Sequence, residues 1–206
     1  ASTTVSAGVS VTCSSRGLRR GRVRLGFSAT GAASSVGAGA SASVATSATG
    51  VFDDLGAKGM DVQERTYDFG LYPADPSETI ALRLPEGFRV IRFVRVYVAD
   101  GQPITHSRIS LPAHRLPGME KFDMSNKSIF GTIREHFGLT VAKAERWISA
   151  AVASDLIADR LEVKPGHPLL DIRSIAVDHD GLPLEFYRAF YNPDISPIHL
   201  QAEAER

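Results

Sequence analysis

The sequence has almost no cysteine and no long apolar run. Its 206 residues contain one cysteine, Cys13, so an internal disulfide is excluded and a reducing compartment is expected. No apolar run approaches the roughly 18–20 residues that a membrane-spanning helix requires. We therefore expect a cytoplasmic protein with no membrane partner. An incidental thiol is the simplest interpretation of Cys13, with a redox role as the alternative.

The sequence also lacks the motifs of several enzyme classes. Its six histidines show no HExxH or similar ligand spacing, and no cysteine follows residue 50, which argues against a zinc site. There is no P-loop, no GxGxxG opening a helix and no GxSxG nucleophile elbow. We therefore expect no metal, no cofactor and no catalytic residue.

Acidic residues are absent from the first 50 positions. This segment holds five arginines, and 35 of its 50 residues are Ala, Ser, Gly or Thr. Such a composition cannot bury enough surface to offset the entropy of ordering the chain, which predicts disorder. A transit peptide and a shifted reading frame are alternative interpretations. The remainder carries 18 basic and 23 acidic residues, a mildly acidic balance that is atypical of a nucleic-acid surface.

Two stretches of the remaining chain resemble each other: "VADGQPITHSR" and "DHDGLPLEFYR". Each has Asp-Gly turn chemistry between β-branched, aromatic-rich segments, which predicts a hairpin. The first hairpin is expected to join strands over 88–99 and 104–112, and the second to join strands over 169–178 and 182–193. We expect the two hairpins to lie side by side in one sheet.

The intervening segments indicate helices and one further strand. Helices are predicted near 77–83, starting at Ser77, over 125–138 with Gly138 as its C-cap, and over 154–161 with Ser154 as its N-cap. Segment 139–153 is best interpreted as a strand, with a helix as the alternative because of its alanines. The helices separate antiparallel strand pairs, and strands and helices do not alternate as in repeated βαβ units. This order indicates an α+β fold, an antiparallel sheet with flanking helices.

Strand alternation places the polar side chains of the two hairpins. Arg95 and Tyr97 share one face of their strand, and the valines between them form the core face. Glu185, Tyr187 and Tyr191 share a face by the same rule. Charged and aromatic groups opposite a core face indicate a lined pocket, with a solvated outer face as the alternative.

The stretches "IRFVRVYVADGQPITHSRISLP", "NKSIFGTIREHFGLTVAKAERWISA" and "LEVKPGHPLLDIRSIAVDHDGLPLEFYRAFYNPD" carry a family resemblance. In them, residues 51–206 resemble the UTRA domain, the effector-sensing half of HutC-type regulators in the GntR superfamily. The resemblance implies a chorismate-lyase-like fold, a homodimer and a small-molecule pocket. Occupancy of that pocket would alter operator DNA binding by an attached winged helix-turn-helix domain.

Residues 1–50 offer neither the length nor the periodicity of a winged helix-turn-helix domain. We therefore expect contact with operator DNA only through a domain that is not visible in this sequence, and a truncated or frame-shifted segment at 1–50. Two alternatives to a regulator remain: a chorismate-lyase-like enzyme on the same fold, and a fragment that folds but does not bind DNA.

The resemblance also implies the ligand-binding residues. Arg95, Ser128, Glu185 and Tyr191 match positions that hold a sugar phosphate in relatives. Tyr97, Ser107 and Phe130 stand where those relatives have Arg, Glu and Tyr, and Tyr187 shares the face of Glu185. The departures weaken the case for a sugar phosphate, so a carboxylate metabolite fits equally well. Arg108 and Arg188 lie on the opposite alternation, where they would pair across the sheet or a dimer interface, or be solvated.

Overall fold

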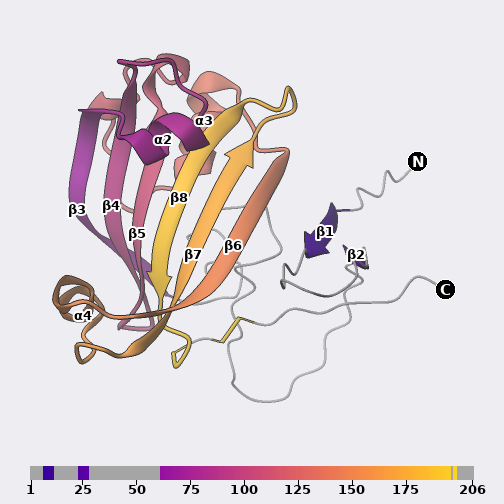
Figure 1. Cartoon of the computed structure of the whole chain (residues 1–206). Helices are drawn as coiled ribbons and strands as arrows, with labels where there is room; N and C mark the ends of the chain where they lie inside the picture. Colours follow the sequence, from indigo (N-terminus) through magenta and orange to yellow (C-terminus); the bar gives the residue numbers. More distant parts are fainter. Residues whose placement is uncertain (1–6, 12–22, 28–60, 196, 199–206) are drawn as a thin grey trace.

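In the computed structural model, the described residues are 7–11, 23–27, 61–195 and 197–198 (Figure 1). The larger part is one six-stranded antiparallel sheet with the strand order β3-β4-β5-β8-β7-β6. Its strands are β3 (Val62–Pro73), β4 (Arg89–Ala99), β5 (Gln102–Pro112), β6 (Lys143–Val152), β7 (Pro168–Val177) and β8 (Pro183–Tyr191). The helices are α2 (Pro76–Ala81), α3 (Ile129–Phe137) and α4 (Asp155–Leu161), with 3-10 turns η1 (Ala113–Arg115) and η2 (Met119–Lys121). The expected α+β architecture is confirmed.

The two Asp-Gly hairpins form the centre of the sheet. β4 pairs with β5, and β7 pairs with β8. Gly101 and Gly181 have φ values of +79° and +75°, a conformation that glycine adopts without steric cost. Because β5 also pairs with β8, the hairpins lie side by side, as predicted.

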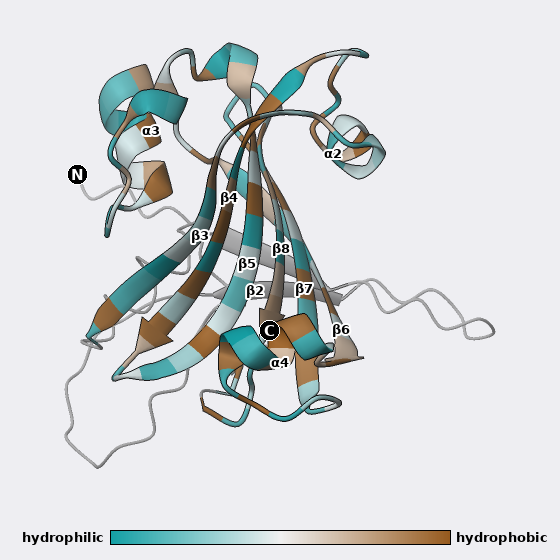
Figure 2. Cartoon of the chain, turned by 90° about the vertical axis from the view of Figure 1, so that its left-hand side faces the viewer, coloured by the Kyte–Doolittle hydropathy of each residue, from teal (hydrophilic) through white to brown (hydrophobic). Residues whose placement is uncertain are grey.

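The sheet is covered on both faces. Figure 2 shows α3 on one side of the sheet and α2 on the other. On the α3 face, Ile129 and Ile133 of α3 join a core that includes Ile91 and Phe93 of β4. On the opposite face, which we call the α2–α4 face, Val96 is packed in a cluster with residues of α4. The valines of β4 therefore do contribute to a core, but so does the face that carries Arg95.

Two of the predicted helix caps are observed as expected, and one differs. Ser154 caps α4 by accepting a hydrogen bond from the Ile157 amide, and Gly138 ends α3 in the left-handed conformation. Helix α2, however, begins at Pro76 rather than Ser77. Its N-cap is Asp75, which forms a capping box with Glu78. Proline is well suited to the first helical position, where its missing amide costs nothing.

The structure also describes two short strands in the segment predicted to be disordered. β1 (Ala7–Val11) and β2 (Val23–Phe27) pair antiparallel, and disorder of residues 1–50 as a whole stays a prediction. Their sequences, AGVSV and VRLGF, place apolar residues at alternate positions, a strand signal that bulk composition conceals. Cys13 and the rest of residues 1–50 lie outside the described residues.

Within the described ranges, none of the helices has both the length and the apolar character needed to span a bilayer. The same part of the chain contains no group of three His, Cys, Asp or Glu side chains arranged to hold a metal ion.

Candidate functional site

Arg95 lies on β4 beneath α3 and is almost fully buried. Its side chain is 1% exposed, and Nη1 is 2.6 Å from a carboxylate oxygen of Glu64 on β3. Nη2 donates to the Met124 carbonyl at 2.8 Å, and the guanidinium lies 4.7 Å from the centroid of the Phe93 ring. Among the described residues, the buried Nε of Arg95 has no hydrogen-bond partner. One donor of this cation is therefore left for another acceptor.

Glu185 supplies a carboxyl group to the same face from β8. The side chain is buried, and burial raises its pKa to about 7, against an opposing influence from Arg146 on β6. Glu185 therefore changes its protonation state close to neutral pH.

Tyr97 and Tyr187 lie on the same face of the sheet as these two charged groups. Burial raises the pKa of Tyr97 to about 12, and the charges of Arg95, Glu64 and Glu185 all act on its hydroxyl. Burial also raises the pKa of Tyr187 well above its usual range, with Tyr97 and Glu185 acting in the same direction. Arg95 and Glu185 are thus on one side of the fold, and the charges of both act on Tyr97.

The sheet register brings two further predicted residues into this region. Ser107 lies opposite Arg95 on the neighbouring strand, and its hydroxyl donates to the Arg95 carbonyl at 3.3 Å. Tyr191 pairs with Thr105 across β5 and β8 and is 1% exposed. Since all six predicted strand residues are buried, the alternative of a solvated outer face is wrong.

Ser128 and Phe130 approach the region from α3. Ser128 is the N-cap residue, and its hydroxyl accepts a hydrogen bond from the Gly131 amide at 3.0 Å. The preceding carbonyl, of Lys127, accepts from Arg95 at 3.4 Å, which fixes the start of α3 beside this arginine. Phe130 is partly buried against the core of the α3 face. The ligand-binding role of all eight residues stays a prediction.

Replacing Ser128 with Ala is expected to lower the free energy of unfolding by about 1 kcal/mol, because an N-cap hydrogen bond is lost. Ser154→Ala is the matched control, since Ser154 caps α4, which packs on the α2–α4 face. Chemical denaturation should show a similar loss for both variants. If Ser128 also binds ligand, only Ser128→Ala will weaken that binding; equal ligand affinity in the two variants would remove Ser128 from the site.

Sequence analysis did not identify Glu64 or Arg146. Glu64 reaches Arg95 because β3 pairs with β4, where Glu64 lies opposite Tyr97, and a register shift between Thr66 and Asp68 changes which side chains face α3. The polar stretch VQERTYD gives no clear alternation from which that face could be assigned. Arg146 lies opposite Ser174 on β7, and its influence on Glu185 depends on the order of three strands.

Arg108 and Arg188 lie on the α2–α4 face, directly opposite each other across β5 and β8. Each forms a salt bridge with a carboxylate. Nη2 of Arg108 is 2.6 Å from Oδ2 of Asp75, and Nη2 of Arg188 is 3.0 Å from Oδ2 of Asp171. They are therefore neighbours across the sheet, and each is charge-paired with an acidic residue instead of being simply solvated.

A family profile and solved structures were each compared with this chain, and both support the expected effector-domain fold. The UTRA domain profile matches residues 57–195. The effector domain of PhnF from Mycobacterium smegmatis superposes with a TM-score of 0.71 and 22% identity, covering 76% of this chain and 96% of that domain. A GntR-family transcriptional regulator from Enterococcus faecalis V583 superposes with a TM-score of 0.62 and 28% identity, covering 67% of this chain and 99% of that one.

A longer structure of PhnF from the same organism is matched over 68% of its length, with a TM-score of 0.68 and 22% identity over 75% of this chain. The family consists of effector domains and not of enzymes, so the lyase alternative is not supported. With the profile spanning 57–195 and the sheet matching solved effector domains, this chain belongs to the UTRA family, the effector-binding domains of GntR-family transcriptional regulators.

Proposed function

We propose that this chain senses a small anionic metabolite on the α3 face of its sheet, and that occupancy alters operator DNA binding by a winged helix-turn-helix domain. The observation that carries the proposal is the burial of two oppositely charged groups, Arg95 and Glu185, on the α3 face. Arg95 is 1% exposed and Glu185 is 8% exposed. Burying charged groups is costly unless they are paired, so their placement in one region argues for a binding role.

The chemistry of the region favours a ligand with one anionic group and several hydrogen-bond donors. The guanidinium of Arg95 is suited to a phosphate or carboxylate, with Nε still able to donate. Glu185, when ionised, accepts hydrogen bonds from hydroxyl or amino groups. Sugar phosphates and hydroxylated or amino-substituted carboxylates meet both requirements.

Glu64 suggests how binding would be transmitted. Its carboxylate is the anion that Arg95 holds in this structure, at 2.6 Å, so an anionic effector would compete with it. Arg95 also binds the carbonyls of Met124 and Lys127, just before α3. Release of Glu64 would loosen β3 from this segment, and an effector that favours one arrangement would shift the population toward it.

Dimerisation belongs to the same proposal, supported by the edge of the sheet. Strand β6 is the last in the strand order and pairs only with β7 within the described sheet. It exposes large apolar side chains: Trp147 is 51% exposed, Ile148 41% and Val152 65%. Exposed apolar groups on a long edge strand are typical of an interface.

A thermal-shift screen of phosphorylated sugars and small carboxylates tests the proposal. Because a ligand that binds only the folded state stabilises it by mass action, at least one compound is expected to raise the melting temperature in a saturable way. The Arg134→Gln variant, which removes an exposed arginine of α3, should respond like the wild type. No saturable shift from any compound of either class would contradict an anionic effector.

A further inference from the structure

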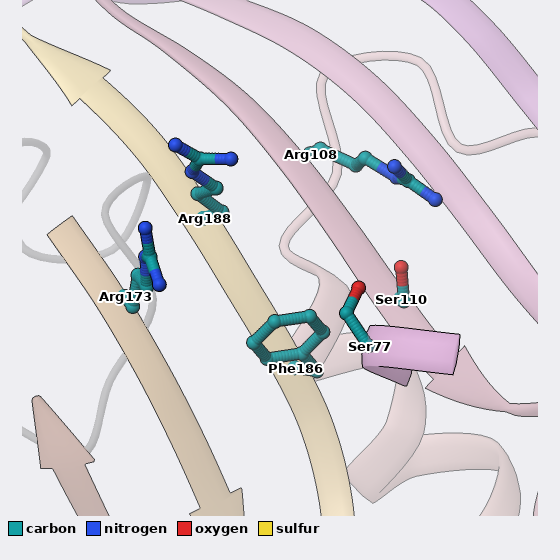
Figure 3. Close-up of a pocket in the computed structure, with 6 residues that line it drawn as sticks. All are labelled: Ser77, Arg108, Ser110, Arg173, Phe186 and Arg188. Carbon is teal, nitrogen blue, oxygen red and sulfur yellow. The ribbon is translucent and has the colours of Figure 1, made fainter. Parts of the chain in front are cut away.

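A second polar cluster lies on the α2–α4 face, away from Arg95. A cavity of about 130 Å³ is present there, lined by Ser77, Arg108, Ser110, Arg173, Phe186 and Arg188. About 10–15 Å³ of such volume is enough for one water molecule, so the cavity has room for an ion of several heavy atoms. Figure 3 shows the Phe186 ring between the two arginines of β7 and β8 and the serines of α2 and β5.

The three arginines of this cavity stand in one row across the sheet. Arg173 is directly opposite Arg188, and Arg188 is directly opposite Arg108. Like charges at directly opposed positions destabilise a sheet. The row is therefore a local electrostatic cost, which an anion bound among the guanidinium groups would relieve.

Carboxylates near this row pair with each of its arginines. Asp171 pairs with Arg173 and Arg188, whereas Asp75 and Glu78 pair with Arg108. Glu78 also pairs with Arg92, on which the charge of Asp68 acts as well, so this cluster contains four carboxylates and four guanidinium groups. None of these carboxylates lines the cavity, so the polar side chains of its walls are arginines and serines.

The arginine side chains keep donors for a ligand. Within the described part of the chain, Arg108 donates through Nη2 alone, and Arg188 through Nε and Nη2. Their side chains are 41% and 46% exposed, and that of Arg173 is 54% exposed, so an ion can reach them from solvent. Each guanidinium is anchored by a carboxylate while other N–H groups remain available, which is a suitable arrangement for forked contacts with an oxyanion.

The remaining lining groups favour an organic phosphate. The Ser77 and Ser110 hydroxyls donate to Asp75 at 2.6 Å and to Glu78 at 2.5 Å. Their oxygen lone pairs can therefore accept hydrogen bonds from hydroxyl groups of a ligand. The Phe186 ring offers an apolar surface for the carbon skeleton.

We propose that this arginine-lined cavity is a second ligand site, which binds the phosphate group of a small hydroxylated metabolite. It is separate from the effector region, because the cavity residues of β5 and β8 alternate with Ser107, Glu185 and Tyr187, which face α3. The site does not depend on the proposed function, since it would bind phosphate whether or not the α3 face holds an effector.

Calorimetric titration of the full chain with inorganic phosphate, and separately with glucose 6-phosphate, tests this site at constant ionic strength. Saturable binding is expected, and tighter binding of the sugar phosphate would identify an ester as the preferred form. Arg188→Gln and Arg108→Gln should each weaken binding about tenfold or more, because a charge-assisted contact is lost. Arg134→Gln is the charge-matched control on an exposed part of α3 and should bind like the wild type.

Arg188→Lys tests whether weaker binding in the glutamine variants comes from misfolding. Lysine keeps a positive charge beside Asp171 but lacks the forked hydrogen-bond geometry of the guanidinium group. The Arg188→Lys variant should remain folded and still bind more weakly than the wild type. The proposal is overturned if neither probe binds, or if the arginine variants of the cavity bind as tightly as Arg134→Gln. It is also overturned if the Arg95→Met/Glu64→Gln double variant, once shown to be folded, no longer binds phosphate, since the ion would then occupy the α3 face.

Discussion

Replacing Arg95 with Met is expected to lower the free energy of unfolding by about 3–5 kcal/mol, the usual cost of removing one partner from a buried ion pair. Both side chains of the pair are buried, Arg95 at 1% and Glu64 at 3% exposure. Without Arg95, the Glu64 carboxylate loses its neighbouring cation, and the Met124 carbonyl loses its donor. Urea or guanidinium denaturation at neutral pH measures the loss.

A companion variant separates the charge from the packing. Burial raises the pKa of Glu64 even though Arg95 opposes the shift, so the ion pair compensates the burial of this carboxylate only in part. Arg95→Met combined with Glu64→Gln should therefore recover most of the lost stability, because a neutral amide replaces the unpaired anion. If the double variant is as unstable as Arg95→Met, the loss comes from packing and from the carbonyl contacts, and the ion pair is not its source.

Replacing Glu185 with Gln is expected to stabilise the protein by about 3 kcal/mol at pH 8 and to have little effect at pH 4. The pKa of Glu185 is raised from 4.5 to about 7 by burial, and each unit corresponds to about 1.4 kcal/mol. Because the folded state binds this proton more tightly than the unfolded state, the contribution is complete below pH 4.5. It is lost as the pH rises from 4.5 through about 7.

Denaturation curves collected between pH 4 and pH 8 measure this effect. The wild type should lose stability over the interval, whereas Glu185→Gln should show a flatter profile, because glutamine does not ionise. Glu86→Gln is the matched control, since Glu86 is exposed and its replacement should leave the wild-type profile unchanged. Parallel profiles for the wild type and Glu185→Gln would show that folding does not change the pKa of Glu185, which would contradict the expected shift.

Local signals in the sequence predicted most of the sheet. The Asp-Gly turns fix both central hairpins because Gly101 and Gly181 take positive φ values, and hydrophobic alternation then sets which residues face which side. The start of α2 was misplaced by one residue because Ser77 and Asp75 are both good capping residues. Only the structure shows that Asp75 accepts the hydrogen bond from the Glu78 amide.

Contacts that depend on strand order could not be predicted from the sequence. Glu64 meets Arg95 only because β3 pairs with β4 through an irregular register. The row of Arg173, Arg188 and Arg108 requires the pairing of β7 with β8 and of β8 with β5. Alternation assigns each arginine to a face of its own strand, but it does not give the neighbours across the sheet. The α3 face was therefore better anticipated than the α2–α4 face.

The most direct test of the effector site is the affinity of a compound from the thermal-shift screen for the wild type, Glu64→Gln and the Arg95→Met/Glu64→Gln double variant. Calorimetry should show tighter binding to Glu64→Gln, because the competing carboxylate is gone, and loss of binding in the double variant, because the guanidinium is gone. Equal affinity for all three proteins would show that the compound binds elsewhere and would contradict an effector site built on Arg95.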